Sequence, residues 1–173
     1  MHLRVVLLCA AALGLAGCDI DGANWGSSTR FKQEFSETRP LPPGGRIFLE
    51  NFNGSVEMMG WDRGEVQITG EKYASTQDVL EQMQIEAVAE GGSLRIRTIR
   101  PALRNCNCGA KYTLRLPRKA VLDRIETSNG SLRLEAIEGE ARLRTSNGSL
   151  TVIDVKGPLE ATTSNGSLEI NGY

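Results

Sequence analysis

The sequence predicts a mainly β protein, a parallel β-solenoid with about 18 residues per coil and a small helix-plus-hairpin insertion. Two observations carry this prediction. The hexapeptide Thr-Ser-Asn-Gly-Ser-Leu occurs three times, at residues 127–132, 145–150 and 163–168, and so repeats every 18 residues. Inside that repeat a glycine recurs every nine residues, and apolar residues follow each glycine at alternating positions. Short fixed repeats of this kind are typical of solenoids, in which successive coils stack.

The N-terminal segment, residues 1–17, is predicted to be an export signal. Arg4 precedes an apolar run from Val5 to Leu15, and these 11 residues are too few to cross a bilayer core of roughly 30 Å. The segment ends in Leu15-Ala16-Gly17-Cys18, which resembles the lipobox of bacterial lipoproteins. That resemblance implies a diacylglyceryl group on the Cys18 thiol and cleavage just before it. An ordinary signal peptide that ends by chance at a cysteine is the alternative.

Lipidation of Cys18 would anchor the chain to a membrane, because two or three acyl chains hold a protein far more firmly than one. Residues 18–39 are polar and contain glycine and serine, so we expect a flexible tether between the anchor and a domain that spans residues 40–173. Asp19 follows the cysteine directly. In enterobacterial lipoproteins an aspartate at this place favours retention, so the resemblance implies the periplasmic face of the inner membrane rather than the outer membrane.

Each half of the repeat is predicted to be a short, half-buried strand that ends in a glycine corner. In the first copy, Leu132 and Leu134 face the interior and Arg133 faces the solvent. Residues 18 apart should then lie side by side, which places Arg142 beside Glu160. A series of up-and-down hairpins fits the same alternation, because Asn-Gly is a strong hairpin turn. The solenoid is favoured, since identical turns recur at every second corner.

One corner of the repeat is predicted to carry a column of asparagines, Asn129, Asn147 and Asn165. Stacked amide side chains can hydrogen-bond one another along such a column, and the glycine after each asparagine can adopt a positive φ. Calcium is the functional alternative, because glycine-rich nonapeptides also build calcium-binding rolls. Those rolls need paired glycines and an aspartate in each turn, which this repeat lacks, so we expect no metal.

The rest of the domain is predicted from shorter patterns. A degenerate copy of the repeat lies at residues 47–68, and an insertion at about residues 71–117 separates it from the three hexapeptides. The insertion should hold a short helix capped by Ser75 or Thr76 and ending near Met83, a hairpin of strands at 84–89 and 93–99, and a strand at 111–116.

Two features of the insertion suggest a functional or structural role, a pair of cysteines and a group of arginines. Cys106 and Cys108 flank one residue in an exported protein, where a disulfide can form. The two cysteines could form a structural disulfide or a redox-active pair, and both alternatives stay open. Two thiolates are too few for a structural zinc site. The insertion is also basic, which fits either a solvated outer face or a contact with an anionic lipid or polysaccharide. Its arginines are Arg95, Arg97, Arg100, Arg104 and Arg115.

The composition excludes several classes of function. The formal charge is −1, so there is no basic excess to neutralise the phosphates of a nucleic acid. The only histidine, His2, lies in the signal segment. A mature chain without histidine cannot build a Ser-His-Asp or Cys-His nucleophile or a histidine-ligated metal site. We therefore expect neither catalysis nor a cofactor.

Residues 40–173 resemble one protein family along their whole length. A helix-and-hairpin insertion, a strand that ends in Leu114-Arg115-Leu116-Pro117 and the repeated Thr-Ser-Asn-Gly-Ser-Leu together resemble the bacterial putative-adhesin β-strand-repeat family, whose function is unknown. The resemblance implies a β-solenoid in the cell envelope, and it brings no catalytic residues.

We expect a lipid-anchored, non-enzymatic cell-envelope protein that presents its β-solenoid to an unidentified protein or glycan. An envelope scaffold or a stress-signalling accessory is the alternative. A carbohydrate-active β-helix enzyme is disfavoured, because the outward acidic residues do not stack on one another. The strand Ser167–Ile170 has nothing in the sequence to lie above it, so we expect an edge-to-edge dimer, a partner strand or a longer natural chain.

Overall fold

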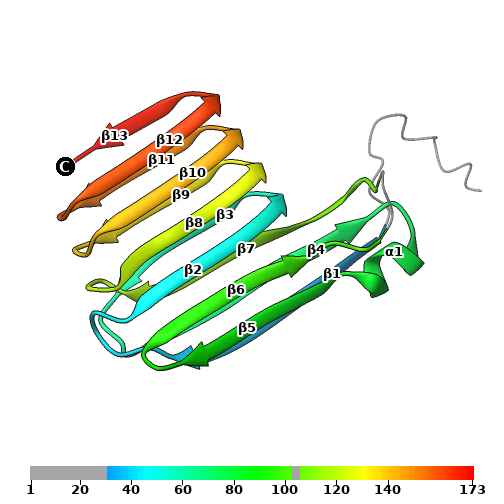
Figure 1. The fold of residues 1–173 in the computed structure, drawn as a ribbon, viewed down its shortest axis with the longest axis horizontal. Coiled ribbons are helices and arrows are strands. Elements are labelled where there is room, and N and C mark those ends of the chain that lie inside the picture. The colour runs from blue at the N-terminus through cyan, green and yellow to red at the C-terminus, as the bar shows by residue number, and fades with distance from the viewer. Residues whose placement is uncertain (1–30, 103–105) are drawn as a thin grey trace, which may run out of the picture.

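The computed structural model describes residues 31–102 and 106–173, which fold into two mixed β-sheets packed face to face (Figure 1). The seven-stranded sheet has the order β1-β4-β7-β3-β9-β11-β13, and the six-stranded sheet has the order β12-β10-β8-β2-β6-β5. Within these residues no helix is both long and apolar enough to cross a membrane. The elements are β1 (Phe31–Pro40), β2 (Arg46–Asn53), β3 (Val56–Trp61), β4 (Glu65–Ala74), α1 (Gln77–Gln82), β5 (Gln84–Glu90), β6 (Ser93–Ile99), β7 (Cys108–Pro117), β8 (Val121–Asn129), β9 (Leu132–Ile137), β10 (Ala141–Asn147), β11 (Leu150–Val155), β12 (Leu159–Asn165) and β13 (Leu168–Asn171).

The prediction of a parallel β-solenoid is wrong. Both sheets are mixed, because β1 pairs with β4, β4 with β7, and β5 with β6 in antiparallel fashion. These strands come from residues 31–40 and 65–117, which lie largely outside the repeat. The 18-residue period specifies how the repeated strands pair with one another, and it leaves the topology of the rest of the domain undetermined.

Within the repeat, the predicted side-by-side register is confirmed. The strands β8, β10 and β12 pair in parallel in one sheet, and β9, β11 and β13 pair in parallel in the other. Arg142 pairs with Glu160, and Thr151 pairs with both Arg133 and Glu169, so the partners lie 18 residues apart. The strands β2 and β3 continue the same two stacks in the N-terminal direction.

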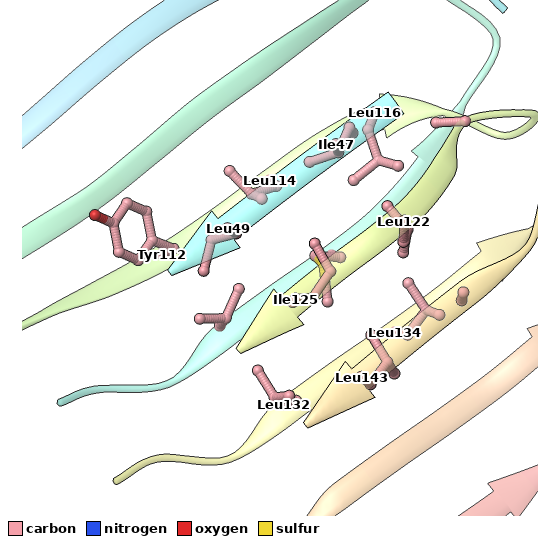
Figure 2. Close-up of a cluster of buried hydrophobic side chains, with 14 of the residues drawn as sticks. Ile47, Leu49, Tyr112, Leu114, Leu116, Leu122, Ile125, Leu132, Leu134 and Leu143 are labelled. Carbon is pink, nitrogen blue, oxygen red and sulfur yellow. The ribbon is translucent and has the colours of Figure 1, made fainter. Parts of the chain in front are cut away.

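The core lies between the two sheets and consists of their inward-facing side chains. Alternate residues of each strand point inward, so the period-two pattern of the sequence becomes one apolar layer from each sheet. Completely burying an aliphatic side chain of this kind contributes roughly 1.5–3 kcal/mol. Figure 2 shows Ile47, Leu49, Leu122, Ile125 and Leu143 of the six-stranded sheet together with Tyr112, Leu114, Leu116, Leu132 and Leu134 of the seven-stranded sheet.

The repeated Thr-Ser-Asn-Gly-Ser-Leu forms the corner between the two sheets, and its threonine and glycine have structural roles. The threonine hydroxyl donates to a glycine carbonyl of the preceding repeat: Thr145 Oγ1 lies 2.9 Å from Gly130 O, and Thr163 Oγ1 lies 2.9 Å from Gly148 O. A Cβ on Gly148 would overlap the Gly130 carbonyl. The expected positive φ is wrong for Gly130, Gly148 and Gly166. Close stacking of the corners, rather than backbone conformation, requires glycine at these positions.

Residues 31–39 lie in β1, so the prediction of a flexible tether is wrong for this part of residues 18–39. Their strand character is masked in the sequence, because Glu37 and Arg39 lie on the same side of β1 as Phe35, which packs against the core. Glu37 and Arg39 form an ion pair, and Arg39 Nε donates to Ala87 O on β5 across 3.1 Å. Phe35 packs edge-on against Tyr112, with ring centroids 5.4 Å apart. These contacts join the edge strands β1 and β5 at the N-terminal end of the two sheets.

The helix and the hairpin of the insertion are confirmed. Thr76 caps α1 by accepting a hydrogen bond from Val79 N at 3.3 Å. The hairpin consists of β5 and β6. The strand β6 pairs in parallel with β2, and β7 pairs in parallel with β3, so this segment contributes strands to both sheets.

Leu150→Ala should destabilise the protein by about 2–5 kcal/mol, because Leu150 is completely buried between the sheets. Leu168→Ala is the matched control: it changes the same residue of the next repeat, where the side chain is 47% exposed, and should cost markedly less. Arg142→Ala, on the outer surface, should cost under about 1 kcal/mol. Urea denaturation followed by circular dichroism measures all three values. Similar losses for the two leucines would contradict the assigned inside and outside positions.

Thr145→Val should destabilise the protein by about 1–3 kcal/mol, because it leaves the carbonyl of Gly130 without its hydroxyl donor. Thr162→Val is the control, since Thr162 is exposed on β12 and should change the free energy of unfolding by less than about 0.5 kcal/mol. Thermal unfolding of both variants checks the difference. A neutral Thr145→Val would show that the corner hydrogen bond contributes little.

Candidate functional site

The outer surface of the six-stranded sheet carries rows of charged side chains, which we call the charged face. They point outward because their neighbours along each strand point into the core. Parallel pairing brings together charges from strands that are far apart in the sequence. The charged face consists of Arg46, Glu50, Arg95, Arg97, Asp123, Arg124, Glu126, Arg142, Arg144 and Glu160.

Arg142 is the centre of the charged face. Its guanidinium lies 2.8 Å from Asp123 Oδ1 and 3.7 Å from Glu160 Oε2, and it also pairs with Glu140. Asp123 in turn accepts from Arg46 Nη1 at 2.8 Å. The predicted proximity of Arg142 and Glu160 is therefore an ion pair. Since these pairs lie near the solvent, each contributes only about 0–1 kcal/mol to stability.

Most of the other arginines of the charged face are also engaged, so the face leaves little free charge for a polyanion. Two of them form ion pairs, and one lies over an aromatic ring. Arg144 makes no ion pair with any residue of the described ranges. The engaged groups are Arg124 with Glu126 at 2.7 Å, Arg97 with Glu50 at 3.3 Å, and Arg95 with Phe48 at 5.1 Å from the ring centroid.

The basic residues of the insertion do not form one basic patch. Arg95 and Arg97 belong to the charged face, whereas Arg115 lies on β7 of the other sheet. Arg100 lies over an aromatic ring, and Arg104 lies outside the described residues. This distribution fits a solvated outer surface better than a single contact with an anionic lipid or polysaccharide.

The three asparagines singled out from the repeat form a hydrogen-bonded ladder at one corner. Asn147 Nδ2 donates to Asn129 Oδ1 at 2.9 Å, and Asn165 Nδ2 donates to Asn147 Oδ1 at 3.0 Å. Asn53 extends the ladder, since its Oδ1 accepts from Asn129 Nδ2 at 2.8 Å. Every bond of the ladder points toward the N-terminal strands. The last acceptor, Asn165 Oδ1, therefore has no hydrogen-bond partner among the described residues.

The C-terminal end of the two sheets is open. The strands β12 and β13 are edge strands, so their outer backbone N–H and C=O groups have no neighbouring strand in the described fold. Core-facing side chains at this end remain partly in solvent: Leu168 is 47% exposed and Ile170 is 44% exposed. Leu150 and Val152, the same positions one repeat earlier, are completely buried. Apolar surface and unpaired backbone groups therefore coincide at this end.

A cleft of about 300 Å³ lies at the corner opposite the asparagine ladder. Its residues come from four turns, at residues 41–45, 62–64, 118–120 and 138–140, and from Trp61 and Pro117, the last residues of β3 and β7. Sequence analysis missed this site, because no motif connects turns so far apart. The one available signal was Trp61, a large aromatic residue at the start of a charged turn.

Cys106 and Cys108 are joined by a disulfide, with Cα atoms 5.2 Å apart. Cys108 is buried in a small apolar cluster beneath α1, so the bridge ties the preceding loop to the base of the helix. Cys18 and Asp19 lie outside the described residues, and their lipidation and sorting roles stay predictions.

The clearest shifts in pKa belong to packed groups. Burial raises the pKa of the Tyr112 phenol to about 12, against the smaller opposing effect of its hydrogen bond with Thr98. Burial lowers the pKa of Lys72, whose Nζ donates to Met83 O at 3.0 Å beside the end of α1. In residues 31–102 and 106–173, no group of three or more histidine, cysteine, aspartate or glutamate side chains is placed to hold a metal ion.

No family model matches the sequence, and no curated protein matches it. Among solved structures, the chain is similar to a "putative cell adhesion protein" from Clostridium sporogenes, with a TM-score of 0.44 and 9% identity over 80% of this chain and 99% of that chain. It is also similar to a "putative adhesin" from Parabacteroides distasonis, with a TM-score of 0.37 and 13% identity over 80% of this chain and 68% of that chain. A "putative lipid binding protein" from the same organism gives a TM-score of 0.28 and 11% identity over 79% of this chain and 73% of that chain. At these identities and TM-scores the likeness carries no functional conclusion.

Proposed function

We propose that the protein is a lipid-anchored, non-enzymatic protein of the bacterial cell envelope that binds another polypeptide at the open C-terminal end of its two sheets. The contrast between the two ends carries this proposal. At the N-terminal end Arg39 joins the edge strands β1 and β5 and Phe35 packs against Tyr112, whereas Leu168 and Ile170 are nearly half exposed at the other end. An added strand would pair the free backbone groups and cover the apolar side chains at the same time.

The side chains at the open end define which strand would fit. Inward positions require apolar residues, because they must cover Leu168 and Ile170. Outward positions beside Glu160 on β12 and Glu169 on β13 favour basic residues, because opposite charges pair across neighbouring strands, as Arg142 and Glu160 do. Asn165 Oδ1 favours a hydrogen-bond donor, such as an asparagine amide, at the corner. The proposed partner is therefore a strand with alternating apolar and basic residues.

A second copy of the chain is a less favourable occupant of the open end. If two copies met there, the acidic residues Glu160 and Glu169 would face a surface that carries the same charges. The free acceptors of two Asn165 side chains would also meet. A basic partner strand avoids both conflicts. An envelope scaffold or a stress-signalling accessory would also bind its partner at this end. Cross-linking in native membranes would identify the bound chain.

A synthetic peptide of residues 127–137 should bind at the open end, because it offers apolar residues at inward positions and Arg133 at the outward position beside Glu169. The Arg133→Glu form of the peptide should bind about fivefold more weakly, which corresponds to about 1 kcal/mol for an exposed ion pair. Fluorescence anisotropy of the labelled peptides measures both affinities. Equal affinities would contradict the proposed charge preference.

Ile170→Lys should abolish binding of this peptide, because an apolar strand cannot cover a charged inward side chain. Glu57→Lys is the matched control: it lies outward on β3, which β9 and β11 separate from β13, and should bind as the parent does. Light scattering over a range of concentrations tests the second copy. If the protein forms a dimer and Ile170→Lys dissociates it, the open end binds a second copy of this chain, and the proposed partner strand is wrong.

Cys18→Ser should abolish incorporation of a labelled fatty acid and leave the protein uncleaved or detached from the membrane. Cys9→Ser, a change within the signal segment, is the control and should keep the label. Label that persists in Cys18→Ser would overturn the anchor. With Cys18 intact, density-gradient fractionation should place the protein in the inner membrane, as Asp19 implies. Recovery with the outer membrane would contradict this sorting.

A further inference from the structure

We infer that the cleft beside Trp61 binds a sugar unit that carries a carboxylate. The cleft has a volume of about 300 Å³, which lies at the lower end of the range of about 300–1,000 Å³ for small-ligand sites. Its turns lie at the corner opposite the asparagine ladder, and none of its residues belongs to β12 or β13. This site is therefore separate from the open end, and the inference goes beyond the proposed function.

The apolar part of the cleft consists of flat rings. Pro43 and Pro117 line it beside the indole of Trp61. The indole is held in place, because its Nε1 donates to Glu65 O at 2.8 Å. Flat apolar rings suit a ligand that has one flat face of C–H groups and polar groups around its edge, as a pyranose ring does.

Three cations surround these rings, and two of them are held by neighbouring groups. The guanidinium of Arg63 lies over the indole, 4.9 Å from the ring centroid, and its Nη1 lies 3.6 Å from Glu65 Oε1. Arg118 Nε lies 3.0 Å from Asp62 Oδ1. The side chain of Lys119 forms no hydrogen bond or ion pair with any residue that the structure describes. A guanidinium held in this way presents its N–H groups in a fixed direction, which suits a carboxylate.

Glu138 supplies the opposite chemistry. Its carboxylate forms no hydrogen bond or ion pair within the described part of the chain, and a carboxylate accepts hydrogen bonds without donating them. The ammonium group of Lys119 donates without accepting. A ligand that satisfies both groups must carry an acceptor and a donor. A sugar acid offers its carboxylate to Lys119 and Arg63, its hydroxyl groups to Glu138 and its apolar face to the rings.

The ammonium group of Lys119, which has no partner among the described residues, favours an acidic sugar over a neutral one. Arg63 pairs with Glu65 and Arg118 pairs with Asp62, so Lys119 is the cation of the cleft that is left to bind the carboxylate of a ligand. An amino acid could also bind both unpaired groups, its ammonium group to Glu138 and its carboxylate to Lys119. Its side chain, however, would need an enclosed apolar pocket, whereas this cleft is open to solvent. A ring that lies flat against the prolines and the indole fits the open shape.

Tryptophan fluorescence tests this inference. The chain has two tryptophans, so Trp25→Phe leaves Trp61 as the only tryptophan reporter in the purified full-length protein. We expect a saturable change with glucuronate and a dissociation constant about tenfold higher for glucose, which lacks the charge-assisted hydrogen bonds of a carboxylate. Lys119→Ala should weaken glucuronate binding about fivefold, because it removes one of these bonds. The control Lys156→Ala changes an exposed lysine of the next turn, outside the cleft, and should leave binding unchanged.

Further ligands and one further variant complete the test. Glu138→Gln should weaken glucuronate binding as well, because an amide accepts sugar hydroxyl groups less strongly than a carboxylate does. Equal affinity for glucuronate and glucose, or no saturable change with glucuronate, would overturn the inference. Inorganic phosphate that binds as tightly as glucuronate would make the cleft a plain anion site. Leucine that binds more tightly would make it an amino-acid site, and either result would also overturn the inference.

Discussion

The close contact between one glycine corner and the next is the constraint on which the C-terminal half of the structure depends. Each repeat places a glycine against the glycine carbonyl of the preceding repeat, where a Cβ has no room, and an inward threonine hydroxyl satisfies that carbonyl. This contact sets the spacing of the corners. The strands between them consequently pair in register, the buried leucines stack on their counterparts, and the asparagine amides come within hydrogen-bond distance of one another.

The same constraint explains how much of the fold could be predicted from the sequence. Register, inward positions and the asparagine column follow from the repeat, because every copy obeys one geometry. The topology of the remaining strands does not follow, since β1 and β4 run antiparallel to their neighbours without any repeated motif. β1 is hidden further because Glu37 and Arg39 lie on its inner side as an ion pair. A pattern of apolar and polar residues alone cannot show that two inward-facing charges, two residues apart on one strand, form an ion pair with each other.

The candidate sites differ in predictability for a related reason. The positions of β12 and β13 follow from sequence, because they belong to copies of the repeat. The cleft beside Trp61 depends on four turns that approach only after both sheets have formed. The charged face was visible as outward residues, but its ion pairs decide its character, and they leave little free charge. A large cluster of charged residues can thus consist of side chains that pair with one another. Charged groups without a partner indicate a binding site better than the size of the cluster does.

The proposed anchor and the open end occupy compatible positions. The described chain begins at Phe31 in β1, and β1 and β13 are the two opposite edges of the seven-stranded sheet (Figure 1). Phe31 lies 13 positions after Cys18, and a chain of 13 residues spans at most about 45 Å. A lipid on Cys18 would therefore keep the first residue of β1 within about 45 Å of the membrane. The open end lies six strand spacings farther along the sheet, or roughly 29 Å at about 4.8 Å per spacing. Because the reach of the tether exceeds this distance, an anchor on Cys18 leaves the domain free to turn the edge strands β12 and β13 away from the bilayer, where a partner strand could reach them.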